Sequence, residues 1–157
     1  MEKSDLFFNS IQALQDDMFA YAFSITRSRE DAEDAVHNAI IKAHGGLPKL
    51  RNAEKLRPWL FKILRNECLL IIRQGKRFTE LDGELPAQQP DRESSLDLSS
   101  AVGSLSRELR ETVVLYYKLG YSTREIARIL RVPRGTVMSR LARARELIKK
   151  RLEGEEK

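Results

Sequence analysis

Apolar residues recur at three- and four-residue steps along most of the chain, a spacing that places them on one face of an α-helix. In the first half this spacing predicts three helices, whose apolar stripes are Phe7, Ile11, Leu14, Met18, Ala22 and Ile25, then Ala32, Ala35, Val36, Ala39, Ile40 and Ala43, then Leu60, Ile63, Leu64, Cys68 and Ile71. Ser28 followed by Asp31 resembles a capping box between the first two helices. Gly45-Gly46 and Gly75 are expected to end the second and third helices. The pattern predicts a small helical bundle.

The periodicity disappears from Arg77 to about Ser99, where TELDGELPAQQPDRESSLD combines two prolines with six carboxylates. Such a composition is typical of a flexible linker, which would let the two flanking halves change their relative position. Beyond it, Leu109, Val113 and Tyr116 form another stripe that ends at Gly120. We therefore expect an all-α fold of two small helical domains, residues 1–77 and 100–157, joined by a flexible acidic linker, residues 78–99.

The second half contains two short helical patterns separated by a break from Leu130 to Pro133. Ser122 and Glu125 form a capping box for the first pattern, and Val137, Leu141, Ala144 and Ile148 form the apolar face of the second. The opposite face of the second pattern is made of Gly135, Thr136, Ser139, Ala142 and Arg143, with Arg134 and Arg140 beside it. Small residues let a helix enter a DNA groove, and guanidinium groups bond phosphates or guanine.

This arrangement predicts a helix-turn-helix whose second helix begins near Pro133 and reads DNA. The expected DNA-binding residues are Arg134, Thr136, Ser139, Arg140 and Arg143. The alternative is an ordinary helical hairpin with solvated arginines.

The charge of the chain changes along its length, although the net charge of its 157 residues is only +5. Residues 1–78 carry +3, residues 79–97 carry −5 and residues 98–157 carry +7. Basic ends favour a polyanionic partner, although a solvated surface gives the same surplus. Cys68 is the only cysteine, which excludes an internal disulfide and a cysteine-cluster metal site. Without an export signal or a long apolar run, we expect a cytoplasmic protein with no membrane insertion.

Three stretches resemble one known family. LSRELRETVVLYYKLGYSTREIARILRVPRGTVMSRLARARELIKKRL resembles region 4 of the extracytoplasmic-function (ECF) sigma factors of the sigma-70 superfamily. REDAEDAVHNAIIKAH is similar to region 2.2, and RPWLFKILRNECLLIIRQGKR is similar to regions 2.3 and 2.4. The resemblance implies an alternative sigma factor that binds RNA polymerase core, reads a minus-35 element with region 4, and opens the minus-10 element with region 2. It implies no catalytic residue, cofactor, metal or small-molecule substrate.

Promoter opening requires cations along the displaced strand and a pocket or platform for an unstacked base. The expected minus-10 residues are Lys62, Arg65, Asn66, Arg73, Lys76 and Arg77, with Asn66 near a flipped base by similarity to relatives. Trp59 is interpreted as a packing residue rather than a stacking platform.

By the same resemblance, a face of the region 2.2 helix contacts the clamp helices of the largest polymerase subunits. Its expected residues are Asp34, His37, Asn38, Ile41 and Lys42. His37, Asn38 and His44 replace a glutamine, an acidic residue and an aromatic residue that are usual in the family, and Leu70 stands where many relatives carry aspartate. An anti-sigma factor is a further implied partner, which could hold the protein at the membrane until it acts at the nucleoid.

Three other interpretations stay open. Asp34 and His37 have the spacing of half a di-iron site, which would need a second such pair and further glutamates from facing helices. A stand-alone helix-turn-helix regulator would share the second half but would not need the region 2 motifs. A degenerate sigma-like protein would keep partner binding without opening promoters.

Overall fold

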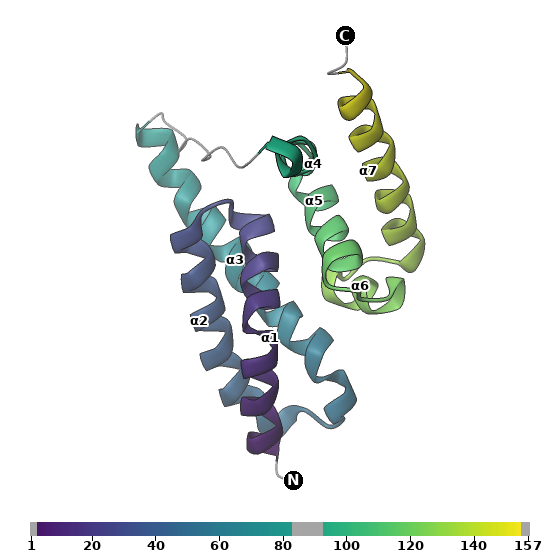
Figure 1. Cartoon of the computed structure of the whole chain (residues 1–157). Helices are drawn as coiled ribbons and strands as arrows, with labels where there is room; N and C mark the ends of the chain where they lie inside the picture. Colours follow the sequence, from purple (N-terminus) through teal and green to yellow (C-terminus); the bar gives the residue numbers. More distant parts are fainter. Residues whose placement is uncertain (1–2, 83–92, 155–157) are drawn as a thin grey trace.

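The described part of the chain is mostly helical and contains no strand (Figure 1). The computed structural model describes residues 3–82 and 93–154, and for residues 53, 76–82 and 93–96 only the backbone. The helices are α1 (Lys3–Thr26), α2 (Arg29–Gly46), α3 (Leu56–Asp82), α4 (Glu93–Gly103), α5 (Arg107–Val113), α6 (Thr123–Leu130) and α7 (Arg134–Gly154). Short helical segments lie between them: η1 (Leu47–Lys49), η2 (Ala53–Lys55) and η3 (Val114–Lys118). The expected all-α fold is confirmed.

Helices α1, α2 and α3 pack against one another as a three-helix bundle (Figure 1). Every residue of the predicted α1 stripe is buried, because the three- and four-residue spacing gathers these side chains on the face toward α2 and α3. The turn into α2 uses Arg27 in the left-handed region (φ 55°) and Ser28 as the N-cap. The Ser28 hydroxyl oxygen accepts the backbone N–H of Asp31 at 3.2 Å. Local cap chemistry thus positions the first two helices.

Helix α3 is longer than the sequence pattern predicted, since it continues past Gly75 to Asp82. A glycine inside a helix costs only about 1 kcal/mol relative to alanine, and no proline follows before Pro86. Helix α4 likewise begins at Glu93, inside the stretch of 78–99 that the sequence assigns to the flexible acidic linker. Helical backbone therefore extends into both ends of the expected linker, whose middle, residues 83–92, lies outside the described residues.

Helices α4 to α7 form the second half, with α5 and α4 contacting α7, and α6 packed against α7. Helix α5 continues as η3, a π-helical segment that shifts the register of the side chains. As a result Leu115 is fully buried, whereas Tyr116, expected in the apolar stripe, is 38% exposed. Val113 is buried as expected.

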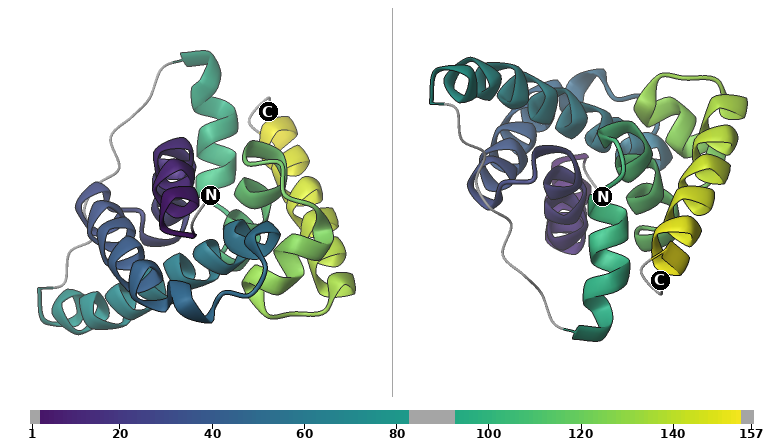
Figure 2. Two further views of the ribbon diagram at one scale, coloured as in Figure 1. Left: turned by 90° about the horizontal axis from the view of Figure 1, so that it is seen from below. Right: turned by 90° about the horizontal axis from the view of Figure 1, so that it is seen from above.

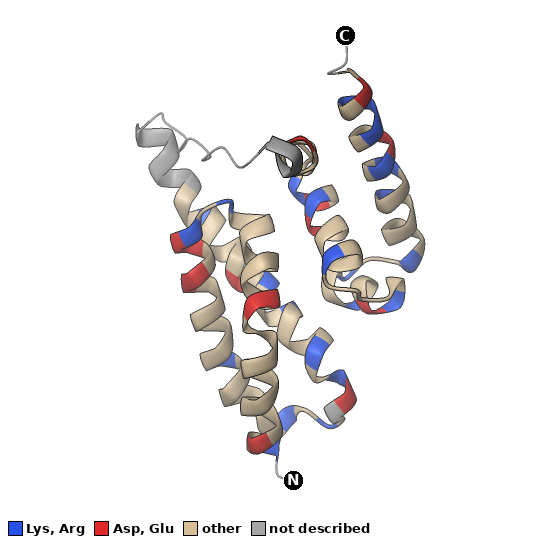
Figure 3. Ribbon diagram, in the orientation of Figure 1, with Lys and Arg blue, Asp and Glu red and all other residues tan. Residues whose placement is uncertain are grey.

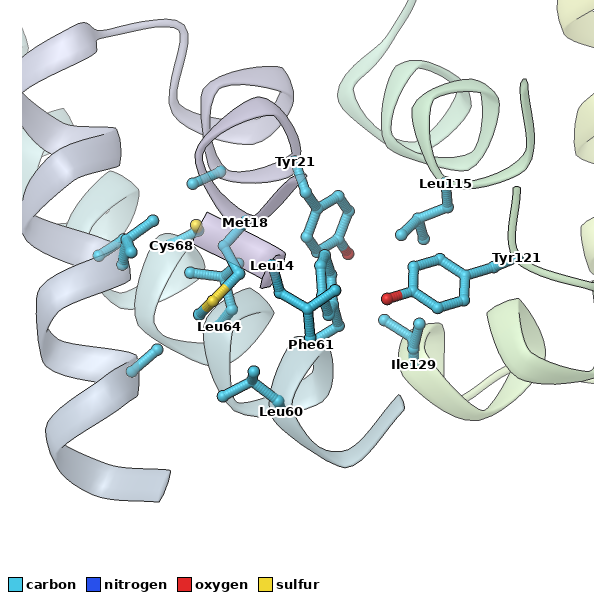
Figure 4. Close-up of a cluster of buried hydrophobic side chains, with 14 of the residues drawn as sticks. Leu14, Met18, Tyr21, Leu60, Phe61, Leu64, Cys68, Leu115, Tyr121 and Ile129 are labelled. Carbon is cyan, nitrogen blue, oxygen red and sulfur yellow. The ribbon is translucent and has the colours of Figure 1, made fainter. Parts of the chain in front are cut away.

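The two halves lie side by side and share one hydrophobic core (Figure 2). Helix α3 contacts α6, and α1 contacts both α5 and η3. In Figure 4, Tyr21 and Phe61 of the first half point toward Leu115 and Tyr121 of the second. The Phe61 ring lies 5.7 Å from the Tyr21 ring and 5.2 Å from the Tyr121 ring. Aromatic packing therefore joins the halves directly, in addition to the chain connection.

Candidate nucleic-acid and polymerase interfaces

The predicted helix-turn-helix is formed by α6 and α7, with the turn at the expected break. Ser122 caps α6: its Oγ accepts the N–H of Glu125 at 3.1 Å, and the Glu125 carboxylate accepts the N–H of Ser122 at 2.9 Å. Arg131 ends α6 in the left-handed conformation (φ 57°), and the backbone N–H of Val132 donates a hydrogen bond to the carbonyl oxygen of Ala127 at 3.1 Å. These bonds satisfy both ends of a short helix and set the direction in which α7 leaves.

Helix α7 presents the two faces that the sequence predicted. Val137, Leu141 and Ala144 are buried, and Ile148 packs partly buried against a second small core. On the other side Gly135, Ser139, Ala142 and Arg143 are exposed, together with Met138 at 52%. Lysine and arginine recur along the helix (Figure 3). The outward face of α7 thus combines small residues with cations, as entry into a DNA groove requires.

The five residues predicted to read DNA differ in their exposure. Arg134, Ser139 and Arg143 are exposed, whereas Thr136 and Arg140 are half-buried. Arg134 Nε donates to Thr123 Oγ1 of α6 at 2.8 Å, which ties the start of α7 to the preceding helix.

Arg140 lies at the side of α7 and not on its outward face. Its Nη2 is 3.8 Å from the Glu108 carboxylate of α5, and its side chain is 20% exposed. Arg140 would therefore have to leave Glu108 before its guanidinium could contact a base.

Helix α3 carries the predicted minus-10 residues on two different sides. Lys62, Asn66 and Arg73 lie within about 40° of one another around the helix axis, since they are four and eleven residues apart. Lys62 is half-buried, and Asn66 and Arg73 are exposed. Arg65 is turned toward the second half of the protein. Lys76 and Arg77 belong to the end of α3 where the side chains lie outside the described residues.

Trp59 is half-buried and lines a pocket beside Asn66. Its ring packs over the end of α2, where a Cβ added to Gly46 would lie 3.2 Å from Trp59 Cζ2. Lys42 and Glu67 also line this pocket and form an ion pair at 2.6 Å. Trp59 therefore packs on the core, as interpreted from the sequence, while one side of the residue borders an open pocket.

Arg65 ends in a polar cluster between the halves that the sequence did not indicate. Its Nε donates to Glu111 Oε1 at 2.8 Å, and the Tyr21 hydroxyl donates to the same oxygen at 2.8 Å. Glu111 and Tyr21 are both fully buried. Burial raises the pKa of Tyr21 well above its usual value, and the charge of Glu111 raises it further.

The cluster also shifts the pKa of Arg65. Burial alone lowers the pKa of Arg65, but the hydrogen bond and the charge of Glu111 outweigh it and leave the pKa raised. No motif could have revealed Glu111, because its partners lie 46 and 90 positions away in the sequence.

The predicted polymerase-binding residues form one outward face of α2. Asp34, His37, Asn38, Ile41 and Lys42 are all exposed, and Ile41 is exposed by 58% although it is apolar. The opposite face of α2, which includes Ala35 and Ala39, is buried against the bundle. The exposed face thus leaves one aliphatic side chain, with polar and charged ones around it, accessible to a partner.

Cys68, the only cysteine of the chain, is buried in the first half. Among the described residues, no group of three or more His, Cys, Asp or Glu side chains is placed to hold a metal ion. Within the same residues, no helix combines the length and apolar character needed to cross a bilayer.

The fold and its surfaces define a class: an all-helical protein with a helix-turn-helix in one half and a cation-bearing helix beside a pocket in the other. Models of known families match both halves. Sigma-70 region 2 matches residues 11–78, and Sigma-70, region 4 matches residues 95–148.

Individual relatives agree with the family models. The ECF RNA polymerase sigma factor SigM of Mycobacterium tuberculosis is 36% identical over 124 residues, which cover 76% of this chain and 63% of SigM. SigL of the same species is 31% identical over 135 residues, covering 79% of this chain and 76% of SigL. The chain thus spans less than two thirds of the length of SigM.

The fold has a solved counterpart in the sigma factor RpoE from Bartonella quintana, whose structure is in complex with the anti-sigma factor NepR. That structure matches with a TM-score of 0.80 and 28% identity, over 94% of this chain and 96% of RpoE. The chain belongs to the ECF RNA polymerase sigma factors of the sigma-70 family.

Proposed function

We propose that this protein is an alternative sigma factor that binds RNA polymerase core and directs initiation at specific promoters. The observation that carries the proposal is the presence, in one chain, of both sigma regions with their expected outer faces exposed: the α2 face and the α7 face. A stand-alone regulator would need only the second of these faces. The protein would carry no catalytic activity of its own and would act in the cytoplasm, at the nucleoid.

The division of labour follows the two halves. Residues 1–77 bind the polymerase clamp helices through Asp34, His37, Asn38, Ile41 and Lys42, and residues 100–157 read the minus-35 element through α7. Arg134, Ser139 and Arg143 are accessible to a groove, and Thr136 and Arg140 flank them. Residues 78–99 connect the two activities.

The pocket beside Trp59 supports a role of α3 at the minus-10 element. The Asn66 amide lies at the pocket, where it could donate to and accept from the edge of an unstacked base. Lys62 and Arg73 share the same side of α3, so that a displaced strand along the helix would meet a cation on either side of the pocket. Arg65, Lys76 and Arg77 complete the proposed strand contacts.

In vitro transcription with core polymerase and a promoter library tests this function. We expect the chain to direct transcripts from a subset of templates that share two sequence elements. Transcription that starts at random, or that equals the level of core enzyme alone, would contradict the proposal. An anti-sigma factor is the further partner we propose, since RpoE is seen bound to NepR.

A further inference from the structure

Helix α5 packs against α1, and its Glu111 side chain contacts Arg65 of α3. The contact is made by Glu111, whose Oε1 accepts hydrogen bonds from Arg65 of α3 and from Tyr21 of α1, both at 2.8 Å. Glu111 has no exposed surface, and the Arg65 side chain keeps 16% of its exposure. One carboxylate of the second half thus joins two helices of the first.

The neighbouring residue reinforces this contact. Arg110 is 9% exposed, and its Nε donates to the backbone carbonyl of Ser24 in α1. Its Nη1 donates to Leu105 O at 2.9 Å, within its own half. Two consecutive charged residues of α5 therefore bind the first half in a fixed geometry.

The ion pair at Glu111 is only partly satisfied. Among the described residues Glu111 Oε2 has no hydrogen-bond partner, and Arg107 Nε lies 3.8 Å from it. A buried carboxylate whose second oxygen lacks partners recovers less of its desolvation cost than a fully bonded one. The Arg65 guanidinium can therefore exchange the Glu111 carboxylate for an anion that binds it more strongly, such as a phosphate.

We propose that Glu111 is an internal competitor of nucleic acid: in the closed arrangement, with the two halves packed together, it occupies Arg65, and a DNA strand reaches Arg65 only after α5 leaves the first half. The proposal rests on the proposed function, because it takes Arg65 as a strand contact. Glu108, which is exposed, lies 3.8 Å from Arg140, so that α5 carries a carboxylate beside one candidate DNA-binding arginine of each half. Lys62, Asn66 and Arg73 stay accessible, and the competition acts on Arg65.

The first test is the affinity of the full chain, without polymerase, for a fluorescein-labelled single-stranded DNA of mixed sequence. Glu111→Gln keeps the shape of the side chain and removes its charge, and we expect about tenfold tighter binding, the worth of one charge-assisted hydrogen bond. Glu33→Gln is the matched control, because it removes the same charge from an exposed carboxylate paired only with Arg29. Equal affinities of the two variants would overturn the proposal. So would a Glu111→Gln/Arg65→Ala double variant that keeps the gain.

The second test measures the closed arrangement without DNA. Dyes on Gln15→Cys of α1 and Lys149→Cys of α7, both exposed positions, report the separation of the halves by energy transfer. We expect lower transfer in Glu111→Gln than in the parent. Unchanged energy transfer would show that Glu111 does not hold the two halves together and would overturn the proposal. Lower transfer without tighter DNA binding would instead contradict the strand contact of Arg65, and with it the competition.

A milder variant keeps the test decisive if Glu111→Gln does not fold. Tyr21→Phe removes only the hydroxyl that donates to Glu111 Oε1 and leaves the ring packed against Phe61. We expect the same direction of change in DNA affinity and in energy transfer, but a smaller one. Wild-type values of both quantities would count against the proposal.

Discussion

Replacing Phe61 with alanine should destabilise both halves of the protein at once. The Phe61 side chain is fully buried, and its ring packs against Tyr21 of its own half and Tyr121 of the other. Truncation of a buried phenylalanine to alanine costs about 3–5 kcal/mol, through lost transfer free energy and the cavity left behind. Each aromatic pair accounts for about 0.5–1.5 kcal/mol of this loss. The expected cost is a large part of the stability of an ordinary domain, about 5–15 kcal/mol.

Urea unfolding with two probes measures this effect. Fluorescence of Trp59, the only tryptophan, reports the first half, and far-UV ellipticity reports both halves. With a slope of about 2 kcal/mol/M, the Phe61→Ala midpoint should fall by about 1.5–2.5 M, and the two probes should change together. Phe8→Ala is the control, because Phe8 is 54% exposed, and it should cost less than about 1 kcal/mol.

The shared core would be refuted by either of two results. In the first, Trp59 fluorescence shifts to lower urea in Phe61→Ala while a separate part of the ellipticity change keeps its original midpoint. In the second, Phe61→Ala costs no more than the Phe8→Ala control.

Three further changes test the helix-turn-helix and the core. Ser122→Ala removes the hydroxyl that accepts the Glu125 N–H, and should cost about 1 kcal/mol in thermal unfolding; an unchanged Tm would contradict the role of the cap. Arg140→Ala should weaken binding to the upstream promoter element by about 1–3 kcal/mol if its guanidinium bonds a base. A variant that initiates as well as the wild-type protein on every template would count against that contact. Burial raises the pKa of the Cys68 thiol to about 12. Since this folded-state pKa exceeds the unfolded one, the stability it contributes is complete below about pH 9 and is lost as the pH rises toward 12. Thermal unfolding between about pH 8 and pH 10 should show this decline, and Cys68→Ala should reduce it.

The helices and the helix-turn-helix could be predicted from the sequence because their determinants are local. The stripe from Phe7 to Ile25 lies on one α1 face, and Ser122 caps α6 through residues only three positions away. The same local signals misplace the end of α3, because Gly75 is a weak helix breaker when the residues on either side continue the helix. They also misassign Tyr116, because a π-helical segment changes the period on which the stripe was read.

The contact between the halves could not be predicted in this way. The linker composition correctly indicated two groups of helices, but it carries no information on which faces meet. From the sequence, Arg65 is one of the cations expected along the displaced strand, and only the fold shows it beside Glu111, 46 positions away. The exposed face of α2 with Ile41 could be predicted because the family resemblance assigns a partner-binding face to this helix.

The most direct test of the central claim is a titration of core RNA polymerase, free of any sigma factor, into the fluorescently labelled full chain. We expect saturable binding that a second sigma factor displaces, together with transcripts from specific promoters when DNA is added. An Ile41→Asp variant should bind more weakly, because the exposed isoleucine would lose its apolar contact. A chain that shows no binding to core polymerase, even at high concentration and low salt, would contradict the assignment of both halves to one sigma factor.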